Sequence, residues 1–254
     1  MSNPIWHAFN DLVTPKSILT MQNRPSENKH YKTFSCTLGN YRLKIDVPEG
    51  FGSMHGDQYG EEYFNKIVNF QMEETSKWLV FEKTINICIF SWYYKLKYLL
   101  GSDYGNSGNV LINASLVQTS GSLKSLSELK SFINNQYEET VKIRLAEIEA
   151  DSSIDEDDEF EKEAHEDYLK SIKAEKPHRL IETSLNGTPC VYYEMNNTGN
   201  NERYYGVPLE SNYFLLINVQ ARGGICNLKD PDKMNTVIEE DINSLVNKIQ
   251  IQRS

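Results

Sequence analysis

The stretch Tyr213-Phe-Leu-Leu-Ile-Asn-Val-Gln220 decides the fold of this 254-residue chain. Its apolar residues follow one another instead of alternating with polar residues. A short, continuous apolar run is typical of a strand that is covered on both faces. We therefore predict that residues 213–220 form the central strand of a sheet, against which the rest of the chain packs.

Strand patterns surround this stretch on both sides. Residues 41–47 alternate apolar and polar side chains, and Pro48-Glu-Gly50 ends them with a turn. Residues 179–184 and 190–194 flank Asn186-Gly187, a strong signal for a two-residue hairpin turn. The remaining strand candidates are residues 78–82, 85–94, 110–118 and 203–209.

Turn-forming residues separate some of these strands. Residues 101–109 contain three glycines, two serines and two asparagines, a composition that favours a loop. Residues 196–201 are similarly polar and predict a second reversal of the chain. We therefore expect a loop between the strands at 85–94 and 110–118, and a reversal before the strand at 203–209.

Two amphipathic helices are predicted. Ser125 and Glu128 have the spacing of a capping box, in which the serine oxygen accepts an amide and the glutamate bonds the cap amide in return. The apolar residues that follow recur every three or four positions and so share one face; they are Leu126, Leu129, Ile133, Tyr137, Val141, Leu145 and Ile148. Asp230-Pro231 predicts the start of a terminal helix, and residues 248–252 predict a short edge strand after it. The apolar stripe of the terminal helix is Ile238, Ile242, Leu245 and Ile249.

The negative charge of the chain is concentrated in one segment. Residues 147–167 contain twelve acidic residues and one base, Lys162, so this segment alone carries −11 while the whole chain carries −10. Binding to nucleic acid needs a clustered basic surface, and the sequence contains no such cluster. We predict an acidic helical or loop insertion at residues 147–167 and no nucleic-acid partner.

The order of four features resembles the PsbP-like fold family. They are YRLKIDVPEGF at 41–51, SLSEL at 125–129, LNGTPCVYY at 185–193 and the terminal helix. The family includes photosystem extrinsic proteins, a Ran-binding import factor, and bacterial DcrB and EagR-type proteins. The resemblance covers residues 31–252 and implies a single α+β domain with a central antiparallel sheet flanked by helices. Residues 1–30, which we expect to form an irregular N-terminal arm or a short helical lead-in, depart from the compact members of the family. Members mostly bind proteins and share no catalytic constellation.

No motif in the chain requires a cofactor or a metal. Ser127-Glu-Leu-Lys130 has the Ser-x-x-Lys spacing but lacks its companion motifs, and a capped helix start explains the same residues. Residues 151–167 lack the glycine that an EF-hand loop needs. The cysteines stand far apart, which favours free buried thiols over a zinc site; they are Cys36, Cys88, Cys190 and Cys226. We predict neither a cofactor nor a metal.

The sequence pattern predicts neither a secretion signal nor a membrane span, and export through a signal that precedes these residues is the alternative. Its first thirty residues do not combine a basic start with an apolar run. The most apolar stretch, residues 85–100, is short for a membrane span and is interrupted by Asn86, Lys95 and Lys97. We expect a cytoplasmic protein with no membrane span, and a reducing compartment also suits the free thiols.

These observations favour a non-enzymatic protein-binding module of bacterial type. We expect an immunity protein that neutralises a toxin, or a chaperone or adaptor for an effector of a type VI secretion system. Its partner would be another protein, such as a basic toxin or a secreted effector, steered by the acidic segment. The candidate partner-binding residues are Asp155, Glu156, Asp157, Asp158, Glu159, Glu161 and Glu163. Two alternatives stay open: an enzyme of unrecognised type with a site assembled from distant strands, and an acidic segment that only increases solubility.

Overall fold

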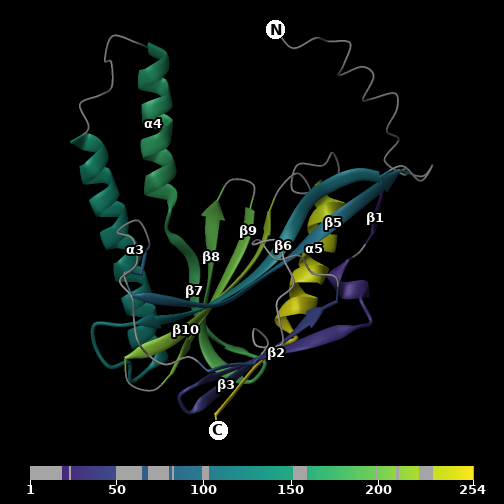
Figure 1. The fold of residues 1–254 in the computed structure, drawn as a ribbon. Coiled ribbons are helices and arrows are strands. Elements are labelled where there is room, and N and C mark those ends of the chain that lie inside the picture. The colour runs from purple at the N-terminus through teal and green to yellow at the C-terminus, as the bar shows by residue number, and fades with distance from the viewer. Residues whose placement is uncertain are drawn as a thin grey trace, which may run out of the picture.

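The chain folds into two β-sheets and three α-helices over the residues that the structure describes (Figure 1). The computed structural model describes residues 19–22, 24–49, 65–67, 80–81, 83–98, 103–150, 159–197, 200–209, 212–222 and 231–253. The predicted α+β class is therefore confirmed.

The larger sheet has seven strands, and every neighbouring pair in it is antiparallel. In spatial order they are β1 (Leu19–Gln22), β5 (Thr84–Tyr98), β6 (Asp103–Gln118), β10 (Tyr213–Arg222), β9 (Asn200–Pro208), β8 (Thr188–Asn197) and β7 (Pro177–Leu185). β10 is the middle strand, which confirms the prediction for residues 213–220. Leu215 and Ile217 are buried on one face of it and Phe214 on the other, because neighbouring side chains in a strand point to opposite faces.

The prediction of a loop at residues 101–109 is wrong from residue 103 onward. β6 begins at Asp103, and its pairing with β5 continues as far as Lys97 opposite Asp103. This long antiparallel ladder overrides the local preference for a turn, and two of its register shifts lie among these turn-forming residues. Asn109 Nδ2 also donates a hydrogen bond to Ser91 Oγ across the pair at 2.7 Å. The strand expected at residues 78–82 lies largely outside the described residues.

The smaller sheet has the order β11-β3-β2-β4. Its strands are β11 (Ile249–Arg253), β3 (Tyr41–Pro48), β2 (Tyr31–Leu38) and β4 (Asn65–Ile67). β2 and β3 form a hairpin in which Gly39 takes the positive φ of +58° that the turn requires. The strand predicted at 41–47 and the edge strand predicted at 248–252 are both confirmed.

The helices are α3 (Leu126–Glu149), α4 (Glu159–Ala174) and α5 (Pro231–Val246). Ser125 caps α3 as predicted, because Glu128 N donates to Ser125 Oγ at 3.2 Å. The return bond differs from the predicted capping box: Glu128 Oε2 accepts from Lys124 N at 2.6 Å rather than from the cap amide. The glutamate thus satisfies the amide that precedes the cap.

Two hydrophobic cores lie on opposite faces of the larger sheet. One contains Ile217 of β10, Ile242 of α5 and Ile45 of the smaller sheet, so α5 and the smaller sheet cover this face. The other contains Phe214, together with Leu129 and Ile133 of α3. The predicted central sheet with flanking helices is therefore present. The structure also contains a second sheet, which the sequence pattern did not distinguish from the first and which contributes to one of the two cores.

Gly206 of β9 brings α3 close to the sheet. A Cβ at this position would lie 3.3 Å from Ile133 Cδ1 and 3.5 Å from Leu129 Cδ2. Because Gly206 has no side chain, Ile133 and Leu129 of α3 can pack directly against β9. This close approach sets the position from which the rest of α3 extends.

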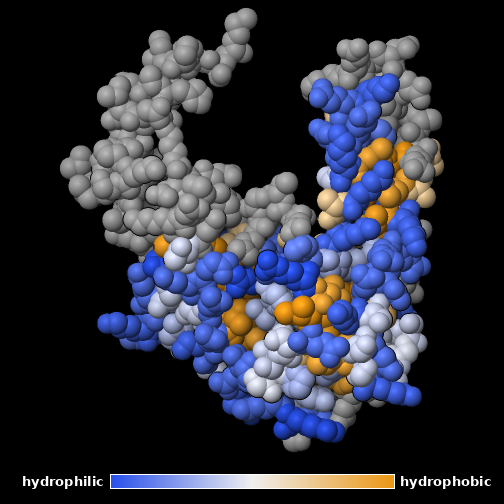
Figure 2. Space-filling view, turned by 180° about the vertical axis from the view of Figure 1, so that it is seen from behind, coloured by the Kyte–Doolittle hydropathy of each residue, from blue (hydrophilic) through white to orange (hydrophobic). Residues whose placement is uncertain are grey.

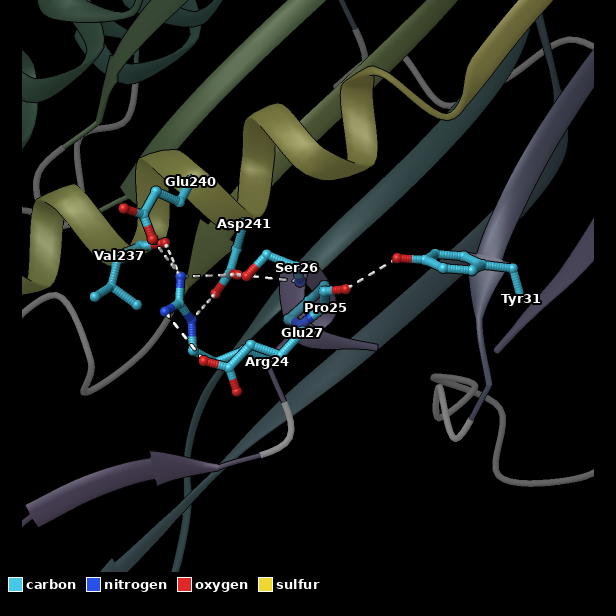
Figure 3. Close-up of polar contacts among 8 residues, drawn as sticks. All are labelled: Arg24, Pro25, Ser26, Glu27, Tyr31, Val237, Glu240 and Asp241. Carbon is cyan, nitrogen blue, oxygen red and sulfur yellow. Dashed lines mark hydrogen bonds and ion pairs between the residues drawn. The ribbon is translucent and has the colours of Figure 1, made fainter. Parts of the chain in front are cut away.

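Part of the expected N-terminal arm belongs to the folded structure. β1 pairs with the outer part of β5, and a short 3-10 helix, η1 (Pro25–Glu27), contacts α5. Figure 3 shows the contact, in which the fully buried Asp241 of α5 accepts hydrogen bonds from Ser26 N at 3.2 Å, Ser26 Oγ and Arg24 Nε at 3.4 Å. Backbone pairing therefore holds residues 19–22, and the buried carboxylate of Asp241 holds residues 24–27, against the rest of the fold.

Candidate functional site

The second half of α3 and all of α4 form a projection that we call the helical arm, residues 138–150 and 159–176. Figure 1 shows the two helices side by side, with α4 reaching farther from the sheets than α3. The first half of α3 packs on the sheet through Leu129, Ile133 and Tyr137. Beyond Val141, which is buried, the apolar stripe of α3 is only half-buried at Leu145 and Ile148. The first half of the predicted amphipathic helix thus packs on the sheet, and the second half forms part of the helical arm.

The C-terminal end of α4 holds it against the body. Ile172 is 2% exposed and Leu169 is half-buried, whereas Glu163, Glu166 and other residues nearer the start of α4 are exposed. Below α4, Arg144 Nη1 donates to Glu175 Oε2 in an ion pair that joins α3 to the end of the arm. A helix of 16 residues is marginally stable alone, so this anchored end sustains the helix that projects from it.

Three of the seven predicted acidic residues lie on the first half of α4. Glu159 and Glu161 lie in the first turn of α4, where carboxylates are favoured because they complement the helix dipole. Glu163 follows on the same helix and is exposed. The other four candidates, Asp155, Glu156, Asp157 and Asp158, lie outside the described residues.

Exposed apolar side chains accompany these charges. The large hydrophobic residues that are exposed within the described ranges are Ile143 at 47%, Tyr168 at 56% and Ile181 at 49%. The first two belong to the arm, and Ile181 lies on the edge strand β7. Figure 2 shows apolar surface on the projecting part of the molecule beside hydrophilic residues. Sequence periodicity predicts none of these exposures, because it does not tell which helical faces lack a neighbour.

A cluster of tyrosines lies between α3 and the larger sheet, with Tyr137 on α3, Tyr193 on β8 and Tyr204 on β9. The hydroxyl oxygens of Tyr137 and Tyr193 are 3.4 Å apart, and the ring of Tyr193 stacks on Tyr204 with centroids 4.8 Å apart. Tyr204 Oη donates to Glu202 Oε2 at 2.8 Å. Burial raises the pKa of Tyr137 and of Tyr193 well above the ordinary value, so both phenols stay protonated at neutral pH. They act as hydrogen-bonding core residues and do not supply a catalytic base.

The cysteines that the structure describes are free and buried. Cys36, Cys88 and Cys190 confirm the predicted buried thiols, while Cys226 lies outside the described residues. Burial raises the pKa of the Cys190 thiol to about 11, so this group is protonated at neutral pH. Within the described ranges, His, Cys, Asp and Glu side chains form no group of three that could hold a metal ion. No helix in those ranges is long and apolar enough to cross a membrane.

No family model, curated protein or solved structure matches this chain. The PsbP-like resemblance and the expected function therefore stay predictions. The features that bear on function are the geometry of the arm, its charges and its exposed apolar residues.

Proposed function

We propose that this chain is a non-enzymatic protein-binding module that contacts its partner through the helical arm. One observation carries the proposal: the arm projects from the sheets and exposes Tyr168 and Ile143 beside a dense set of carboxylates. Tyrosine is enriched among residues that dominate binding energy, because its large, rigid ring buries apolar area while its hydroxyl keeps a hydrogen bond. Carboxylates around such an anchor raise the association rate with a basic surface.

The charge of the arm fits the more specific roles proposed from the sequence. A toxin or secreted effector with a basic cleft would meet the acidic residues first, and the apolar residues of the arm would then contact the cleft wall. We propose an immunity protein of this kind, or a chaperone or adaptor for a secreted effector of type VI secretion, in the bacterial cytoplasm. A PsbP-like sheet carrying an acidic insertion would supply the rigid body from which the arm projects.

Reversing the charge of the arm is expected to slow binding. With the partner isolated by pull-down from the native host, we expect Glu159→Lys/Glu163→Lys to lower the association rate constant by about tenfold at 50 mM salt, because steering depends on the sign of the local field. The difference should shrink at 500 mM salt, where screening shortens the range of the field. Surface plasmon resonance at both salt concentrations measures these rates.

The matched control is Glu49→Lys/Glu182→Lys, which makes the same change of charge at exposed residues outside the arm. Its association rate should stay within about twofold of wild type, since distant exposed charges are largely screened. If both double variants slow binding equally, only the total charge matters and the arm is not the contact surface. Failure to recover any stable protein partner at low salt would count against the whole proposal.

Removing the aromatic ring on the arm is expected to speed dissociation. Tyr168→Ala should raise the dissociation rate constant by about tenfold or more, because interface tyrosines often contribute more than roughly 1 kcal/mol. Ile181→Ala is the control, since this residue is exposed to a similar degree but lies on β7. Equal dissociation rates for Tyr168→Ala and wild type would place the contact surface elsewhere.

A further inference from the structure

A groove with a basic rim lies between α3 and the end of α4. Its volume is about 400 Å³. Val141 and Leu145 supply its apolar lining, and Glu138 together with Lys142, Lys173 and Lys176 supply its polar lining. A volume of this size falls within the range of roughly 300–1,000 Å³ that is typical of ligand sites.

The three lysines of the groove carry charge that the described residues do not neutralise. Within those residues, no carboxylate lies within ion-pair distance of Lys142, Lys173 or Lys176. Two other cations of the same helices are paired: Arg144 with Glu175, and Lys170 with Asp167 at 3.0 Å. The groove therefore keeps a local positive charge in a chain whose net charge is −10.

Glu138, the acidic residue of the groove, does not cancel the positive charge of the three lysines. Glu138 Oε1 accepts a hydrogen bond from Asn134 Nδ2 at 3.0 Å, one turn earlier on α3. With three lysines and one glutamate in its lining, the groove has a net positive charge. A ligand that is negatively charged over a length of about two helical turns would match it.

We propose that this groove binds an acidic, amphipathic peptide segment of a partner protein. Carboxylates of the segment would pair with the lysines, and a large apolar side chain would cover Val141 and Leu145. Because apolar and cationic groups line the same groove, a segment with both kinds of side chain is preferred over a simple anion. An amphipathic helix laid in a groove between helices is an established mode of peptide recognition.

Glu159, at the start of α4, does not reach this groove within the same molecule. Glu159 precedes Lys173 by fourteen positions on one helix, which separates them by roughly 21 Å at the rise of an α-helix. The groove is therefore a second surface of the arm, opposite in charge to its outer end. The inference goes beyond the proposed function, because it holds whether or not the acidic end binds a partner.

A synthetic peptide tests the groove directly. The probe is a fluorescein-labelled 16-residue peptide of leucine and glutamate with the leucines at helical spacing, and binding is followed by fluorescence anisotropy at 50 mM salt. We expect Lys142→Glu/Lys173→Glu to raise the Kd by about tenfold or more, since removing partners from charge pairs commonly costs at least 1.4 kcal/mol. Lys83→Glu/Lys130→Glu alters two exposed lysines outside the groove and should change the Kd by less than about twofold.

Three further measurements make the test specific. A peptide in which every glutamate is replaced by glutamine should bind at least about tenfold more weakly to the wild type, because the lysines then lose their partners. Glu159→Lys/Glu163→Lys should bind the acidic peptide about as tightly as the wild type, which separates this site from the proposed function. Lys142→Gln/Lys173→Gln gives an intermediate Kd and guards against misfolding of the reversed variant, with folding followed by circular dichroism.

Three results would overturn the proposal. Equal weakening by the groove variant and the Lys83/Lys130 control would show that the peptide responds only to total charge. Equal binding of the glutamine and glutamate peptides would remove the lysines from the contact. Dimerisation of the wild-type protein in sedimentation equilibrium, lost in Lys142→Glu/Lys173→Glu, would show that the groove is occupied by a second copy of this chain.

Discussion

Phe214→Ala is expected to lower the free energy of unfolding by about 3–5 kcal/mol. Phe214 is fully buried on the central strand β10, and its ring meets Phe81 and Phe132 edge to face with centroids 5.5 and 6.1 Å apart. The truncation leaves a cavity between the sheet and α3 and removes both ring contacts. Because the helical arm continues from α3, weaker packing of α3 on the sheet also makes the position of the arm less stable.

Equilibrium denaturation in urea measures this change, with the free energy obtained by linear extrapolation. Phe132→Ala is the matched control, since Phe132 joins the same cluster but is only half-buried and should cost less. Phe214→Leu keeps most of the volume and should cost under roughly 1.5 kcal/mol. A loss below about 1 kcal/mol for Phe214→Ala would contradict the packing of α3 on the central strand.

Asp241→Ala is expected to lower the free energy of unfolding by about 3 kcal/mol. Asp241 is fully buried on α5 and accepts hydrogen bonds from Ser26 and Arg24 of the N-terminal segment (Figure 3). Its removal leaves the Ser26 amide and hydroxyl without their acceptor in a largely buried place. Arg24 keeps its ion pair with Glu240 at 2.7 Å. The expected loss of unfolding free energy is therefore at the lower end of the range that is usual for breaking a buried ion pair.

The neighbouring residue provides a control for this second prediction. Glu240 pairs with the same arginine, but its side chain is 58% exposed, so Glu240→Ala should cost no more than about 1 kcal/mol. A double-mutant cycle between Arg24 and Asp241 isolates their coupling. Similar losses for Asp241→Ala and Glu240→Ala would show that the buried carboxylate does not hold residues 24–27 on α5.

The candidate site was partly predictable. The sequence located the acidic residues and the helix that leads to them, because charge and apolar spacing are local properties. It did not predict that α4 would extend past α3 or that Tyr168 would be exposed, because both depend on how the two helices pack. The lysines of the groove come from positions 142, 173 and 176, and only the pairing of α3 with the end of α4 brings them together.

The sequence by itself determined the elements whose cause is local. The continuous apolar run at 213–220 became the central strand, Ser125 capped α3, and Asn186-Gly187 formed the hairpin turn with positive φ values of 48° and 88°. Tertiary structure alone decided the length of β6, the clamp between Arg24 and Asp241, and the stack of Tyr193 on Tyr204 beneath α3. The physical reason is that these features depend on burial and pairing between elements of the folded chain, and periodicity within one segment carries no information about them.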